Sequence, residues 1–190
     1  MKPLTKAIAV ALIQVLIVCS LGAKLLYDRH TRPQAWFLAE RYDPNLPIRG
    51  RYLALRLDVT DSRTPQELEQ KFGADRDYQM KTFHHVWYFG QECGSIVMRD
   101  GKPVAQFDSG RFGDCRNLSF ERWPRGDQSV LQLREPVLFF IPDTSREFWM
   151  LKPGEEMWVL ATIPGKGPPR PIRVGIKKAG DATITPLDVN

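Results

Sequence analysis

The longest apolar pattern in the chain lies near its N-terminus, where an uncharged run occupies residues 7–23. Only Gln14 and Ser20 interrupt the run, so it lacks the polar face of an amphipathic core helix. As a helix it would be about 25 Å long, and continued through residue 27 it would reach about 30 Å, the thickness of the hydrocarbon core of a bilayer. The pattern predicts an N-terminal signal anchor at residues 1–27, with residues 7–27 in the lipid bilayer.

The same run has the layout of a cleaved signal peptide, because basic residues precede it and small residues follow. Cleavage after Gly22 would place Ser20 at the small-residue position of the processing site, but the run is longer than most signal-peptide cores. We therefore expect an uncleaved anchor. Lysine and arginine lie on both sides of it, so their count does not settle the orientation. We expect the short N-terminal tail to stay inside and the rest of the chain to be exported.

Beyond residue 50, apolar and polar residues alternate as they do in β-strands. The clearest case is Tyr52–Val59, where leucine or valine occupies every second position from Leu53 onward. The continuous apolar run Val137–Ile141 indicates a strand that is buried on both faces. A hairpin turn is expected at Asp100-Gly101. Further strands are expected at 85–89, 95–99, 104–107, 130–133, 157–163, 172–177 and 183–189.

One helix is predicted in the same part of the chain. Thr64 and Glu67 form a capping box at its start, and Gly73 is expected to end it after about two or three turns. Short strands separated by turn signals are typical of a sandwich or a barrel. We predict a mainly β chain, in which a juxtamembrane connector at residues 28–49 follows the transmembrane helix. Residues 50–190 then form a single antiparallel β-sandwich or partly closed barrel with one short helix.

The charges and cysteines refine this picture. The net charge is +5 and the basic residues are scattered. No basic block alternates with aromatic residues, so nucleic-acid binding is not expected. Cys19 lies in the apolar run, which leaves Cys93 and Cys115 as a pair. They would form a disulfide in an oxidising compartment and stay reduced otherwise. Because an anchored domain is exported, we expect the disulfide.

Metal binding is not predicted. His84 and His85 could be combined with Cys93 and Cys115, but the paired spacing of zinc ligands is missing. Adjacent residues in a strand point to opposite faces, so the two histidines would not share one metal ion. We expect neither a metal ion nor a cofactor.

The candidates for catalysis are few. Cys93 with a nearby histidine could form a nucleophile and base, and Ser95 or Ser109 could be paired with Lys102. None of these residues lies in a recognised motif. A lysine beside a hairpin turn is exposed, whereas a lysine base needs burial to lower its pKa. We therefore expect no catalytic residue.

The segment Arg49–Tyr52 is the best candidate for a binding role. Arg51 and Arg56, together with Tyr52, would form a polar patch for a partner protein or for lipid head groups. The alternative is a turn that enters a strand with a solvated outer face. The sequence favours this second interpretation.

The stretch DPNLPIRGRYLALRL at residues 43–57 resembles the signature of the GDYXXLXY protein family. Gly50, Tyr52 and Leu55 occupy positions of the family motif. An arginine stands where the motif has aspartate, and a leucine where it has its final tyrosine, so any role of that aspartate does not carry over.

The resemblance extends to segments 135–142 and 168–173, which are similar to segments of the same family. The family consists of predicted membrane-anchored bacterial proteins with no assigned activity. The resemblance implies an N-terminal anchor and a compact exported domain. We accordingly expect a single-pass protein of the bacterial inner membrane with a periplasmic C-terminal domain.

These observations lead to one expected function and two alternatives. The expected function is non-catalytic, in which the exported domain binds or assembles with another envelope or membrane protein. The first alternative is a membrane-tethered, peptidase-like envelope hydrolase that uses Ser95 or Cys93. It would require a pocket in which such groups lie within hydrogen-bond reach. The second alternative is an intracellular soluble protein whose first helix belongs to the core.

Overall fold

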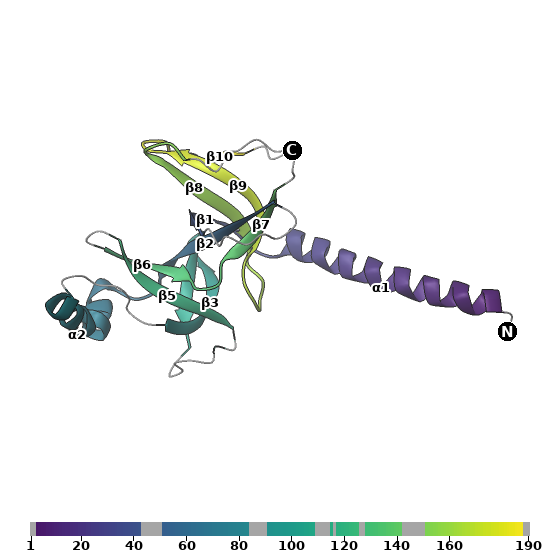
Figure 1. Ribbon diagram of the computed structural model, residues 1–190, viewed down its shortest axis with the longest axis horizontal. Coiled ribbons are helices and arrows are strands. Elements are labelled where there is room, and N and C mark those ends of the chain that lie inside the picture. Colours follow the sequence, from purple (N-terminus) through teal and green to yellow (C-terminus); the bar gives the residue numbers. More distant parts are fainter. Residues whose placement is uncertain are drawn as a thin grey trace. The chain divides into compact units, whose positions relative to one another are not determined.

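The computed structural model describes residues 3–42, 51–83, 91–108, 115, 117–125, 128–141 and 151–187. The chain divides into two compact units, Met1–Pro33 and Gln34–Asn190. The first unit consists mainly of one helix, and the second contains the strands together with a second helix (Figure 1).

Helix α1 (Pro3–Thr31) contains the apolar run. Its segment Lys6–Thr31 is the one helix in the described part of the chain that is long and apolar enough to span a membrane. The hydroxyl of Ser20 donates a hydrogen bond of 2.8 Å to the carbonyl of Ile17. The helix itself thus satisfies this polar group, as a nonpolar environment requires.

The second unit has ten strands and helix α2 in the described part. The bounds are β1 (Gln34–Arg41), β2 (Arg51–Asp61), α2 (Pro65–Phe83), β3 (Gln91–Arg99), β4 (Lys102–Phe107), β5 (Leu118–Arg125), β6 (Gln128–Leu133), β7 (Val137–Ile141), β8 (Glu155–Thr162), β9 (Arg170–Lys178) and β10 (Thr185–Pro186).

Five of these strands close into a barrel in the order β2-β4-β3-β5-β6, with β6 pairing again with β2. Thr60 of β2 lies opposite Val104 of β4 in a parallel contact, and the other pairings described in the barrel are antiparallel. The prediction of a mainly β chain with an N-terminal apolar helix and a barrel is confirmed, with this one parallel contact as an addition.

The first half of β2 belongs to a second, antiparallel sheet of order β10-β9-β8-β1-β2-β7. This sheet curls until β7 approaches β9. Figure 1 shows β2 running from the curled sheet into the barrel, so one long strand belongs to both.

The hydrophobic core follows the alternation of the strands. The aliphatic side chains of β2 that the sequence places on one face are all buried, and Leu55 and Leu57 are fully enclosed. Phe37 of β1 and Phe120 of β5 are the largest fully buried side chains. Because β2 is shared, a single core cluster extends through the curled sheet and the barrel.

The predicted connector at residues 28–49 contains the end of α1 and the whole of β1. The compact domain therefore begins at Gln34 instead of residue 50. Ala35, Phe37 and Ala39 alternate and are buried, as in a strand. Two of these three inward residues are alanines, so the apolar period in the sequence is weak.

The capping box of α2 is present. The Thr64 amide donates to the Glu67 carboxylate at 2.7 Å, and the Glu67 amide donates to the Thr64 hydroxyl at 3.3 Å. The hydrogen bond from the Thr64 amide lowers the pKa of Glu67. The predicted stop at Gly73 is wrong, since the helix continues to Phe83. A glycine inside a helix costs only about 1 kcal/mol relative to alanine, and the residues after Gly73 continue the helix.

The predicted hairpin at Asp100-Gly101 joins β3 and β4. Both residues have positive φ, 50° and 74°, as a tight hairpin turn requires. The strand predicted at residues 85–89 lies outside the described residues.

Candidate functional site

The outer surface of β2 and β7, together with the residue that follows β1, carries a group of large side chains that we call the aromatic face: Tyr42, Tyr52, Arg56, Leu138 and Phe140. The strand register brings them together. Tyr52 lies opposite Phe140, and Ala54 lies opposite Leu138. On the other side of β2, the Tyr42 amide donates to the Ala54 carbonyl at 2.9 Å. Residues that lie opposite each other across strands share a face, so these side chains are neighbours on one surface.

The apolar part of the aromatic face is exposed. The exposed fractions are 58% for Leu138, 57% for Phe140 and 50% for Tyr52. The rings of Tyr52 and Phe140 meet edge to face with centroids 5.4 Å apart. The prediction that Val137–Ile141 is buried on both faces is therefore wrong. Its inward residues contact the core, whereas its outward residues face solvent.

Arg56 lies at the edge of the apolar part, between aromatic rings. Its guanidinium carbon is 4.2 Å from the centroid of the Tyr42 ring and 5.7 Å from that of Trp123. Its Nε is buried and has no hydrogen-bond partner among the described residues. A guanidinium stacks favourably on aromatic faces, but its N–H groups still need acceptors.

A network of charges borders Arg56 on the same surface. Arg125 donates to Asp58 at 2.6 Å and also pairs with Glu40. The Gln132 amide donates to Glu40 at 3.0 Å and to Asp58 at 2.8 Å. Burial raises the pKa of Asp58 even though the hydrogen bonds from Arg125 and Gln132 oppose the shift. The two carboxylates nearest to Arg56 along the strands are thus already occupied.

A second ionic cluster lies inside one end of the barrel. Arg63 donates to both carboxylate oxygens of Glu92, at 2.8 and 2.7 Å, and to those of Asp61, at 2.9 and 2.8 Å. Arg122, which is only 3% exposed, also pairs with Asp61, and Lys71 of α2 pairs with Glu92. The cluster therefore joins helix α2 to the end of the barrel.

The pKa values in this cluster follow from burial and pairing. Burial lowers the pKa of Arg122 to about 10. Burial alone would raise the pKa of Glu92, but Arg63 and Lys71 outweigh it and lower that pKa. The Arg63 guanidinium also lies 3.9 Å from the centroid of the Phe107 ring. The carboxylates of this ionic cluster are neutralised by basic residues of the same cluster. We therefore assign the cluster a structural role in closing the barrel.

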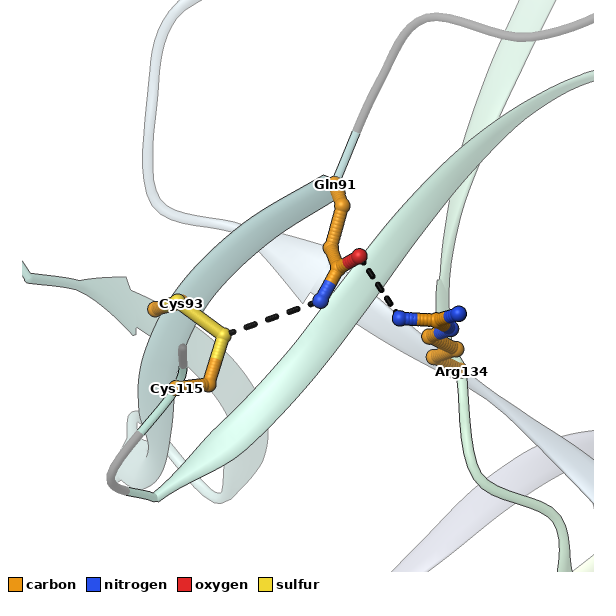
Figure 2. The surroundings of a disulfide bond; sticks show 4 residues. All are labelled: Gln91, Cys93, Cys115 and Arg134. Carbon is orange, nitrogen blue, oxygen red and sulfur yellow. Dashed lines mark hydrogen bonds between the residues drawn. A yellow bond between two sulfur atoms is a disulfide. The ribbon is translucent and has the colours of Figure 1, made fainter. Parts of the chain in front are cut away.

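The predicted disulfide between Cys93 and Cys115 is present, with Cα atoms 5.2 Å apart. Figure 2 shows Gln91 beside it, with its amide donating to the Cys115 sulfur at 3.9 Å. Arg134 in turn donates to the Gln91 carbonyl oxygen at 2.7 Å. The disulfide connects the start of β3 to the chain just before β5. Cys19 of α1 is a free cysteine.

The other sequence candidates that the structure describes are not brought into one site. Cys93 is in the disulfide and is not a free thiolate. Ser95 lies opposite Gln106, and Lys102 lies opposite Arg99. Ser95 and Lys102 are therefore about 13 Å apart along the hairpin. Ser95 borders a cavity of about 190 Å³ under the loop at residues 163–169.

Several candidates fall outside the described residues, namely His84, His85, Ser109 and Gly50. Among the residues that are described, no group of three or more histidine, cysteine or acidic side chains could hold a metal ion. Of the other motif positions, Tyr52 lies on the aromatic face and Leu55 is fully buried in the core.

Sequence reasoning missed most of the aromatic face. The sequence groups Tyr52 with Arg56, but the continuous apolar run of β7 predicts an interior position for Leu138 and Phe140. The available signal was the length of the apolar run at Val137–Ile141, which makes both faces of one strand apolar. Only the structure shows that one of these faces is uncovered.

Comparison of the chain with protein-family models, curated proteins and solved structures finds no match. A shared architecture does not transfer a function, so the functional argument depends on the residues of this chain.

Proposed function

We propose that this chain is a membrane-anchored, non-catalytic domain that binds another envelope or membrane protein through the aromatic face. The observation that carries the proposal is the exposure of Tyr52, Leu138 and Phe140 side by side on one surface. Contiguous apolar patches on a soluble surface commonly mark interaction sites, whereas isolated apolar side chains do not.

The composition of the aromatic face supports a protein partner. Tyrosine, phenylalanine and arginine are enriched at protein interfaces, and the residues that contribute most to binding often come from tyrosine and arginine. The network of Glu40, Asp58, Arg125 and Gln132 supplies a polar border on one side. An apolar centre with a polar rim is the usual anatomy of such an interface.

The proposed location is the bacterial inner membrane, with α1 as a single-pass anchor and the β domain in the periplasm. The length of α1 supports the anchor, and the Cys93–Cys115 disulfide supports an oxidising compartment. The resemblance to the GDYXXLXY family points in the same direction. Only Arg32 and Pro33 separate α1 from β1, so Gln34 lies within about 11 Å of Thr31. A tether this short would hold the domain near other membrane proteins.

Site-specific photo-crosslinking in intact membranes tests the proposal. Phe140 would be replaced by p-benzoylphenylalanine in the full-length protein, and Lys178, an exposed residue of β9, would serve as the control position. We expect a crosslinked protein of defined mass from position 140 and none from position 178. The double variant Leu138→Ser, Phe140→Ser should abolish co-purification of that protein without changing the melting temperature. A partner-free monomer with no crosslink from position 140 would contradict the proposal.

A further inference from the structure

The aromatic face contains one feature that specifies the chemistry of its partner. The guanidinium of Arg56 is held 4.2 Å from the Tyr42 ring and 5.7 Å from the Trp123 ring. Two aromatic neighbours restrict its orientation before any partner arrives, which reduces the entropy lost on binding. It is therefore a preorganised cation at the edge of the apolar patch.

Among the residues that the structure describes, neither neighbouring carboxylate pairs with this cation. Glu40 is the cross-strand neighbour of Arg56, and Asp58 is the next residue on the same face of β2. Both carboxylates are instead engaged by Arg125 and Gln132. The buried Nε of Arg56 has no hydrogen-bond partner in the described part of the chain. The Arg56 side chain as a whole is only partly buried. A partner carboxylate would therefore pair with the accessible nitrogens of the guanidinium and not with Nε, through charge-assisted hydrogen bonds.

On the basis of the proposed function, we infer that Arg56 binds an acidic side chain of the partner protein while apolar side chains of the partner cover Tyr52, Leu138 and Phe140. The strand register sets the spacing of these groups. Leu138 lies opposite Ala54, one same-face step from Arg56. That step is about 7 Å along the strand. Because Leu138 lies on the neighbouring strand, it is a diagonal neighbour of Arg56 at about 7–8 Å. The partner therefore presents a carboxylate beside its apolar contact.

A carboxylate suits the site because its two oxygens match the planar fork of a guanidinium. The network at Glu40 and Asp58 would repel a second acidic group placed beyond Arg56, which limits where the carboxylate can sit. Arg56 thus specifies both the charge of the partner and the register in which it docks.

The test compares crosslinking yields from Phe140 replaced by p-benzoylphenylalanine in full-length protein carrying wild-type Arg56, Arg56→Lys or Arg56→Gln. We expect Arg56→Gln to lower the yield about tenfold in low salt, since a charge-assisted hydrogen bond is lost. We expect the crosslinking yield of Arg56→Lys to lie between those of the wild type and Arg56→Gln, because lysine keeps the positive charge but lacks the planar, two-pronged guanidinium. The wild-type yield should decrease as sodium chloride is raised, and the Arg56→Gln yield should not. Arg173→Gln, on an exposed position of β9, is the matched control and should leave the yield unchanged.

The outcomes separate this inference from the proposed function. If Arg56→Gln gives the wild-type yield and salt dependence, the role of Arg56 is refuted while partner binding stands. If no crosslink forms even with wild-type Arg56, the proposed function fails. Mass spectrometry of the crosslinked peptide should identify an aspartate or glutamate within a few residues of the attachment site. Attachment to a phospholipid, or to a peptide without an acidic residue, would overturn the inference. Equal melting temperatures for the variants would show that they fold.

Discussion

Removal of the Cys93–Cys115 disulfide should lower the stability of the β domain by a predictable amount. The bond joins residues separated by 22 positions. In the chain-entropy model, a loop of this size contributes about 3 kcal/mol by restricting the unfolded chain. For a domain of this size, that corresponds to a decrease of about 6–12 °C in melting temperature. The double variant Cys93→Ala, Cys115→Ala removes the bond without adding a polar group at Cys93, which is buried.

The assay is thermal unfolding of the full-length protein in detergent, followed by tryptophan fluorescence. We expect the oxidised wild type to melt above the double variant, and reduction should bring the wild type down to it. The double variant itself should not respond to reductant. Cys19→Ala is the control and should melt like the wild type, because Cys19 is a free cysteine of α1. Equal melting temperatures for the oxidised wild type and the double variant would refute the reasoning.

Other substitutions test the packing and the charges, each measured by urea unfolding. A Cβ at Gly94 would lie 2.3 Å from the Gln106 carbonyl oxygen, so Gly94→Ala should cost about 3 kcal/mol. Phe139→Ala should cost about 3–5 kcal/mol because it empties a core position, whereas Phe140→Ala should change stability by less than about 0.5 kcal/mol. Equal effects at the two positions would contradict the assignment of the faces of β7. The pKa of Glu92 is lowered from 4.5 in the folded protein. The ionised Glu92 carboxylate therefore stabilises the fold above pH 4.5, and this stabilisation is lost as the pH falls through the pKa of the folded state. Glu92→Gln should therefore be less stable than the wild type at pH 7 and lose less stability in acid.

The parts of the fold that could be predicted from the sequence are those with a strong local signal. The alternation in β2, the capping box at Thr64 and Glu67, and the Asp100-Gly101 turn each act over a few neighbouring residues. Such signals survive folding because the tertiary structure does not compete with them.

The errors have a common physical origin in contacts between distant segments. The sequence of β1 resembles a connector because alanines occupy most of its inward positions, and only the pairing with β2 and β8 makes it a central strand. The aromatic face depends on which sheet surface stays uncovered, which no local pattern encodes. The orphaned Nε of Arg56 depends on Arg125 engaging Glu40 and Asp58, and Arg125 lies far away in the sequence.

The direct connection of α1 to β1 has a mechanical consequence. β1 is hydrogen-bonded on both sides, to β2 through pairs such as Ala39 and Leu57 and to β8 through pairs such as Gln34 and Thr162. Next to the anchor, β1 pairs with β8 from Gln34 onward, and its pairs with β2 begin at Ala39. A pull on the anchor would therefore load the β8 ladder first and the β2 ladder behind it. The same strand leads directly to Tyr42. Tension between a bound protein and the lipid would thus pass along one short strand, held by β8 near the anchor and by β2 near Tyr42.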